Sequence, residues 1–154
     1  MKNLCIFAAI AALLVGSVAI GADLRSNILP KVVIVPKSVS DNTAEVGAII
    51  DRLGYGSVTF VIEVGANADN TSLTPSLVDC ALDNCADAVA VTSELIGTIA
   101  AATHPSGTNA IYSLGYSGNK RYVRLTLTPG AANSDAITFS AAAILGHPKY
   151  APAQ

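Results

Sequence analysis

Three cations lie close together in a chain that has few charges. Lys120, Arg121 and Arg124 fall within the segment GYSGNKRYVRLTL, whereas only 13% of all residues are charged. Such a cluster can bind phosphate groups, form ion pairs on a sheet or contact another subunit. On an alternating strand Arg121 and Arg124 point to opposite faces, and the net charge of the chain is −2. We therefore expect no nucleic-acid binding, and instead ion pairs with a neighbouring strand or a neighbouring subunit.

Two cysteines flank a short turn in the segment DCALDNCAD. Cys80 and Cys85 can close a small disulfide across this turn, or they are two small apolar side chains beside a loop. A zinc site is not expected, because neither histidine is near in the sequence to complete the usual four ligands. Asp79, Asp83 and Asp87 surround the turn and offer oxygen ligands for Ca²⁺. Their spacing does not match an EF-hand loop, so a solvated turn is the favoured interpretation.

The remaining polar residues show no pattern that is typical of catalysis. His104 and His147 each precede a proline in an expected turn, and neither has the spacing of a metal-binding pair. The chain has no paired carboxylates, and no glycine-rich loop lies in the strand–turn–helix context that binds phosphate. We therefore expect a protein that is not an enzyme and that needs no cofactor and no metal.

Short segments with alternating apolar and polar residues follow residue 30. The clearest is SVTFVIEVG, in which Val58, Phe60 and Ile62 alternate with other residues, and RYVRLTLTPG alternates in the same way. The glycines and the asparagine of GYSGNK favour a tight hairpin turn before the second of these strands. Pro75 indicates that the strand before Cys80 lies at a sheet edge. About eight short strands with frequent turns predict an all-β fold, a single β-sandwich or jelly-roll-like domain.

The first 22 residues form an apolar segment whose single charge is Lys2. A positive start, an apolar run and a small-residue end are typical of a secretory signal peptide that ends at Ala22. The length also suits a membrane anchor or a buried helix. We expect the following organisation: residues 1–22, a signal-like or anchor segment; 23–40, an N-terminal arm and first strand; 41–147, the β-sandwich domain; 148–154, a proline-rich tail.

Four segments resemble a family of small virion structural proteins of tailed bacteriophages and prophages. They are DLRSNI (23–28), DRLGYGSVTFVIEVG (51–65), GYSGNKRYVRLTL (115–127) and AAAILGHPKYAP (141–152). The chain departs from the family's pattern in CALDNCADA, where the family carries a tryptophan-containing turn, and in the apolar segment 1–22. The resemblance offers no active-site residues. It implies a virion component of the head, located at the capsid surface.

The function that the resemblance implies is capsid decoration, capsid cement or a head spike, through protein–protein contacts. The implied partners are the major capsid protein or other virion proteins, together with further copies of the chain in a homo-oligomer. Arginine suits such contacts because its planar group satisfies carboxylates and carbonyls. The candidate assembly residues are Arg25, Arg121, Tyr122, Arg124, Pro148, Lys149 and Tyr150.

An exported β-sandwich that binds carbohydrate or another surface is the alternative hypothesis. This function needs exposed aromatic side chains on one face, and the chain has no tryptophan. The candidates are Tyr55, Tyr112, Tyr116 and Tyr122. Localisation would then be exported or periplasmic after signal cleavage, whereas a membrane partner is expected only if residues 1–22 are retained.

Overall fold

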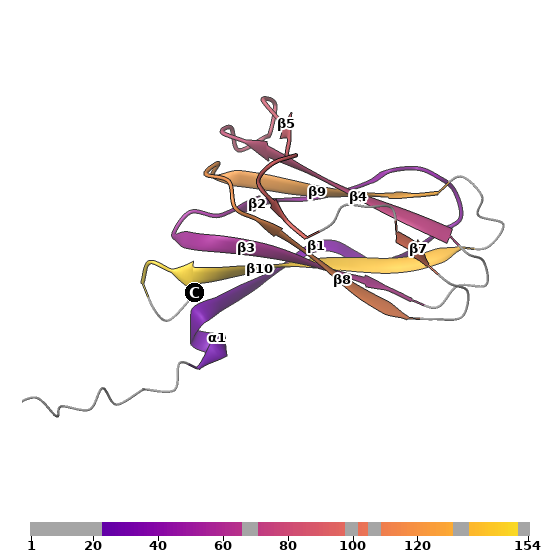
Figure 1. The fold of residues 1–154 in the computed structure, drawn as a ribbon, viewed down its shortest axis with the longest axis horizontal. Helices are drawn as coiled ribbons and strands as arrows, with labels where there is room; N and C mark the ends of the chain where they lie inside the picture. Colours follow the sequence, from indigo (N-terminus) through magenta and orange to yellow (C-terminus); the bar gives the residue numbers. More distant parts are fainter. Residues whose placement is uncertain (1–22, 66–70, 98–101, 105–108, 131–135, 151–154) are drawn as a thin grey trace, which may run out of the picture.

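A computed structural model describes residues 23–65, 71–97, 102–104, 109–130 and 136–150 (Figure 1). These residues form two β-sheets that pack face to face, together with one short helix. The predicted all-β sandwich is thereby confirmed. The apolar segment 1–22 and the last tail residues, 151–154, lie outside the described residues. Within the described ranges, no helix has the length and hydropathy that a membrane span requires.

Each layer of the sandwich is an antiparallel sheet. The first sheet, the lower layer in Figure 1, contains in spatial order β1 (Ile28–Val39), β10 (Ile137–Pro148), β3 (Tyr55–Val64), β8 (Ala110–Tyr116) and β6 (Leu95–Ile96). The second sheet contains in order β2 (Glu45–Asp51), β9 (Tyr122–Pro129), β4 (Thr71–Cys80) and β5 (Val89–Ala90), and β7 (Ala102–His104) also pairs with β4.

The pairing of the strands is nested from the ends of the chain inwards. β1 pairs with β10, β2 with β9, β3 with β8, and β4 with β5 and β7. Successive pairs alternate between the two sheets, and this winding is that of a jelly roll. The sequence pattern left a plain sandwich and a jelly roll open, and the strand order selects the jelly roll.

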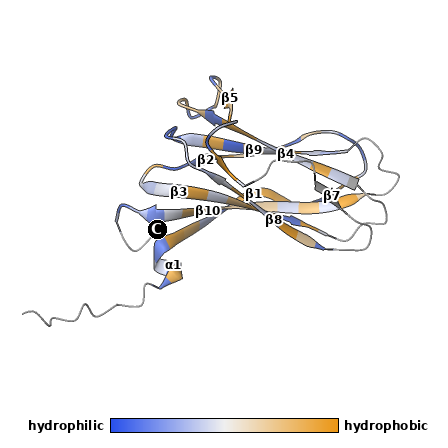
Figure 2. Ribbon diagram, in the orientation of Figure 1, coloured by the Kyte–Doolittle hydropathy of each residue, from blue (hydrophilic) through white to orange (hydrophobic). Residues whose placement is uncertain are grey.

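The core lies between the two sheets and is built mainly from aliphatic side chains. Along β9, buried and half-buried residues alternate strictly, as a strand with one inward face requires. Phe60 and Phe139 are the two fully buried phenylalanines, and leucine, isoleucine and valine fill most of the remaining space. Figure 2 shows that apolar and polar residues intersperse along the strands of both layers. The domain is therefore held by one continuous hydrophobic core.

Residues 28–39 form the first strand that the sequence placed within residues 23–40, and this strand is part of the sandwich. β1 pairs with β10 from Ile28 opposite Gly146 to Val39 opposite Ile137. The short helix α1 (Leu24–Asn27) precedes it, and the carboxylate of Asp23 caps this helix by accepting from the backbone N–H of Arg25 at 3.1 Å. β1 joins the sandwich because β-branched residues in its centre are buried in the core. The domain therefore begins before residue 41, the predicted boundary.

The predicted hairpin around residues 117–121 is wrong. β8 lies in the first sheet and β9 in the second, so this segment crosses from one layer to the other. Glycine and asparagine allow a tight turn in either arrangement, because they adopt many backbone conformations. Packing in the core decides which sheet β8 joins and which sheet β9 joins. The local sequence of the turn does not encode this choice.

Pro75 led to the prediction of an edge strand, and the structure corrects it. β4 lies inside the second sheet, with β9 on one side and β5 and β7 on the other. β7 pairs with residues 71–73 and β5 with residues 78–79. Pro75 falls between these two short partners, where no described strand needs the N–H that proline lacks. Proline therefore still occupies a position where no described strand needs an N–H, although β4 as a whole lies inside the sheet.

Candidate functional site

Arg121 forms an ion pair within the chain. Its Nε and Nη2 atoms donate to the two carboxylate oxygens of Asp51 at 2.9 and 2.6 Å, and its guanidinium lies 4.8 Å from the centre of the Tyr122 ring. The hydrogen bond from Arg121 lowers the pKa of Asp51, and the same bond raises the pKa of Arg121. The side chains are 45% and 42% exposed, and such surface pairs add little stability. Arg121 is therefore already engaged by its own chain.

Arg124 lies in the middle of the outer face of the second sheet. It stands on β9 between Ile49 of β2 and Val78 of β4. Its side chain is half-buried, and its Nε atom is buried with no hydrogen-bond partner in the described part of the chain. The terminal N–H groups of a half-buried guanidinium can donate to a carbonyl or carboxylate oxygen of a partner protein. Tyr122 shares this face, as the alternation of β9 predicted.

The other candidate assembly residues lie at a different place. Arg25 is exposed on α1, which contacts β1 and β10 of the first sheet. Pro148 ends β10, the backbone N–H of Lys149 donates to the carbonyl oxygen of Gly54 at 2.8 Å, and Tyr150 is 87% exposed. The structure does not bring these residues together with Arg124 on one surface. The predicted set therefore divides into two groups, one on each sheet.

Arg52 is a buried charged residue that the sequence analysis did not single out. Its side chain is 9% exposed, and its Nη1 atom donates to the carbonyl oxygens of Gly118 and Lys120, both at 2.9 Å. Its guanidinium lies 4.7 Å from the centre of the Tyr116 ring, and burial lowers the pKa of Arg52. Arg52 thereby anchors the crossing between the two sheets. The sequence signal was weak, because an arginine beside a glycine turn equally suits an exposed loop.

Tyr116 connects the two sheets through a hydrogen bond. Its side chain is buried, and its hydroxyl donates to Oδ2 of Asp79 at 2.6 Å and accepts from the backbone N–H of Lys120 at 3.2 Å. Burial and the bond to Asp79 raise the pKa of Tyr116 to about 12. Asp79 is therefore occupied by an internal contact. The arrangement is structural, since the Tyr116 hydroxyl finds both its acceptor and its donor inside the domain.

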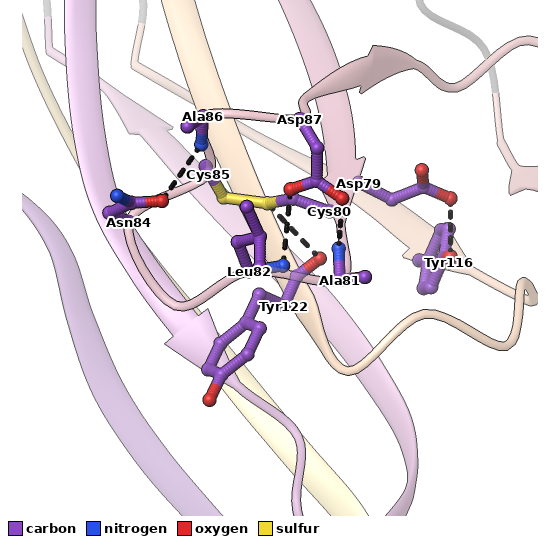
Figure 3. Close-up of a disulfide and its surroundings, with 10 residues drawn as sticks. All are labelled: Asp79, Cys80, Ala81, Leu82, Asn84, Cys85, Ala86, Asp87, Tyr116 and Tyr122. Carbon is purple, nitrogen blue, oxygen red and sulfur yellow. Dashed lines mark hydrogen bonds between the residues drawn. A yellow bond between two sulfur atoms is a disulfide. The ribbon is translucent and has the colours of Figure 1, made fainter.

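Cys80 and Cys85 are joined by a disulfide (Figure 3). Their Cα atoms lie 5.2 Å apart, and both residues are buried although the loop between them is exposed. The carboxylate of Asp87 accepts from the backbone N–H groups of Ala81 and Leu82 at 2.9 and 3.1 Å, and these bonds lower the pKa of Asp87. The loop is thus braced by a covalent bond and by a carboxylate. Asp87 therefore holds the loop in place through its backbone N–H groups.

The outer face of the first sheet is almost free of charge, and we call it the neutral face. The strand register places these residues on it, in rows across the strands: Pro30, Ile144, Thr59, Gly115 and Ile96; Val32, Ala142, Val61 and Ser113; Ser140, Glu63 and Ile111. Glu63 is the only charged residue among them, and its carboxylate accepts from the hydroxyl of Ser140 at 3.3 Å.

Large apolar side chains on the neutral face project into solvent. Val32, Ile96 and Ile111 are 65%, 64% and 70% exposed. A groove of about 500 Å³ adjoins the face at one end, where its lining includes Ile111 and Glu63. The outer face of the second sheet has a different character, because charged, aromatic and hydroxyl side chains lie on it. The neutral face is therefore the surface of this domain that is best suited to contact apolar protein surface.

No catalytic or metal centre emerges from the described residues. They contain no group of three or more histidine, cysteine, aspartate or glutamate residues that could hold a metal ion. The Nδ1 atom of His147 lies 2.9 Å from the Oγ atom of Ser57, on the exposed surface. Within the described ranges no carboxylate bonds to this imidazole, so the third group of a triad is missing there. This pair supports no hydrolytic mechanism.

Comparison of the chain with models of protein families, with curated proteins and with solved structures gives no match.

Proposed function

We propose that this protein is a non-enzymatic structural protein of a phage virion. Its most direct role would be capsid decoration, capsid cement or a head spike, through contacts with the major capsid protein or another virion protein. The neutral face carries this proposal, because Val32, Ile96 and Ile111 are exposed there and Glu63 is the only charged residue in its rows. Exposed apolar patches of this kind mark protein contacts on folded domains.

The fold and the sequence resemblance support the same role. Jelly rolls are used by viral capsid proteins, although lectins and enzymes use them as well, so the fold is only an analogy. A virion subunit needs a rigid body and contact surfaces, and it needs no catalytic centre. Binding would come from buried apolar surface on the neutral face, and Arg124 would add directional contacts on the opposite sheet.

The alternative, a carbohydrate-binding module, finds less support in the structure. Such a site needs aromatic rings exposed on one face. Tyr116 is buried, and Tyr55, Tyr112 and Tyr122 are half-buried. We therefore do not propose carbohydrate binding as a second function.

Purified particles provide the test of this proposal. Particles from the native source are separated on a density gradient, washed with detergent and salt, and analysed by quantitative mass spectrometry. We expect this chain in a fixed ratio to the major capsid protein. The intact mass would also show whether residues 1–22 are present. If the protein is absent from particles but present in the medium or the cell envelope, the virion role is refuted.

Substitution of Arg124 tests the contribution of the second sheet. Arg124→Ala is expected to lower incorporation into particles while the domain stays folded, because the side chain makes no hydrogen bond through its Nε atom to the described residues. Unfolding curves of the isolated variant serve as the control for folding. Incorporation equal to that of the wild type would remove Arg124 from the contact surface.

A further inference from the structure

We propose that the neutral face binds a second copy of this chain, so that two first sheets pack against each other across a two-fold axis. This inference names the partner of the surface described above, and it rests on the proposed function only for the biological role of the dimer. The protein can be found in particles and yet fail to dimerise in solution. It can also dimerise in solution and yet be absent from particles.

The charge of the neutral face fits a copy of itself. In a two-fold contact each patch meets the same patch, so every charge near the axis meets its own like charge. The neutral face carries only Glu63, which lies in the row at one end of the face and already binds Ser140. The outer face of the second sheet would instead bring Arg124 near another Arg124. Like-charge repulsion is therefore smallest on the neutral face.

The size of the face fits a weak dimer. The four longer strands, at about 4.8 Å each, span roughly 19 Å, and nine residues of a strand at about 3.4 Å per residue span roughly 30 Å. β6 adds only two residues to this area. The face thus offers about 600 Å² per copy, and a dimer would bury about 1,200 Å², the lower limit of a stable specific interface. The loss of translational and rotational freedom on association offsets much of the free energy gained by burying this area. We therefore expect a dissociation constant on the order of 10 µM.

The shape of the face favours a sheet over a single chain segment. An extended peptide would cover one or two rows of the face, whereas the face of another sheet covers all of them at a spacing of about 10 Å. Pairing through the edge strand β1 is disfavoured, because Pro30, Pro36 and Lys31 and two register shifts interrupt it. The open flat surface, and not this edge, is the place where a second copy fits.

Sedimentation velocity over a concentration series tests the proposal. The probes are the full chain, the double variant Val32→Lys/Ile111→Lys and the matched control Val46→Lys. Val46 is 59% exposed and lies on the outer face of the second sheet, so the control adds one of the two lysine charges of the double variant, at similar exposure and away from the neutral face. The double variant places two lysines in each copy of the contact, and we expect dimerisation to weaken on the order of 100-fold, since buried unpaired charge is costly.

Two results would overturn the proposal. The first is a wild-type protein that stays monomeric up to about 200 µM, which is well above the expected constant. The second is association that Val46→Lys weakens as much as the double variant does. Circular dichroism and thermal unfolding check that every variant is folded. The segment 1–22 is present in all three proteins, so differences among them do not arise from it.

A tryptophan reporter separates a second copy from other occupants. The chain has no tryptophan, so Ile111→Trp introduces the only indole, on the neutral face. A blue shift of its emission that grows with protein concentration supports the dimer. A blue shift that is independent of concentration and disappears when residues 1–22 are removed would assign the face to that segment. A shift that appears only with anionic lipid vesicles would assign it to a membrane, and either of these two results overturns the proposal.

Discussion

Tyr116 provides a sharp test of the contact that joins the two sheets. Its buried hydroxyl donates to Asp79 at 2.6 Å and accepts from the backbone N–H of Lys120 at 3.2 Å. Tyr116→Phe removes only this hydroxyl and keeps the ring beneath the guanidinium of Arg52. At neutral pH we expect the variant to lose about 1.5 kcal/mol of unfolding free energy, the value of one hydrogen bond to a charged acceptor.

The pH dependence of this loss follows from the raised pKa of Tyr116. Burial and the bond to Asp79 raise it from 10.0 to about 12, so the folded protein holds the phenolic proton more tightly than the unfolded chain does. Below pH 10 both states are protonated and the stabilisation is complete. Between pH 10 and 12 the unfolded chain loses its proton first, so stability falls, by about 1.4 kcal/mol at pH 11. Tyr116→Phe lacks this loss.

The stability of the wild type and the variant should therefore converge at high pH. Urea unfolding followed by far-ultraviolet circular dichroism at pH 8, 9, 10 and 11 measures the difference between the two proteins. We expect about 1.5 kcal/mol at pH 8 and close to zero at pH 11. Tyr150→Phe, at a position that is 87% exposed, controls for the loss of a surface tyrosine. A difference between wild type and Tyr116→Phe that stays constant from pH 8 to 11 would refute the reasoning.

Three further predictions concern other contacts of the domain. Replacing Cys80 and Cys85 by serine should lower the unfolding free energy by about 2 kcal/mol, the chain-entropy value for so short a loop; guanidinium titrations with and without reductant measure it, and equal midpoints would contradict it. Gly47→Ala should cost about 1–3 kcal/mol, because the new Cβ would lie 2.6 Å from a core valine and 2.8 Å from a backbone oxygen of β9; an unchanged thermal midpoint would show that the core gives way easily. Arg121→Ala should cost about 0.5 kcal/mol at most, and less at 1 M salt. The pKa of Asp51 is lowered in the folded state, so this small contribution is present above its unfolded pKa and is lost as the pH falls through the folded pKa; a loss that does not respond to salt or to acid would argue against an ion pair.

Local patterns were sufficient for the class of the fold and for many strands. The alternation in SVTFVIEVG and RYVRLTLTPG predicted strands that the structure places at Tyr55–Val64 and Tyr122–Pro129. Period-two alternation is readable because a strand turns successive side chains to opposite faces, whatever its neighbours are. The same argument separated Tyr122 and Arg124 from the inward residues of β9. Boundaries were less predictable, since the sequence placed the first strand within residues 23–40 and only the structure gives its bounds, Ile28–Val39.

The candidate site depended far more on contacts between distant segments. Arg124 was singled out from the sequence, whereas Arg52 was not, although Arg52 is the more deeply buried of the two. Its carbonyl partners Gly118 and Lys120 lie more than sixty residues away, and no local pattern shows such contacts. Residues of the neutral face were likewise spread over five strands. Each of them is an ordinary outward residue, and only the register shows that they adjoin.

The amino-acid sequence is enough to establish an all-β domain with an aliphatic core, few charges, and two cysteines close enough to be joined. These properties are local or additive, since they follow from composition, alternation and spacing. Three features become visible only in the three-dimensional fold: residues 117–121 cross between the sheets, Arg52 anchors this crossing, and one outer face is nearly free of charge. These features depend on which strands are neighbours and in what register, and that choice is made by the packing of the whole core.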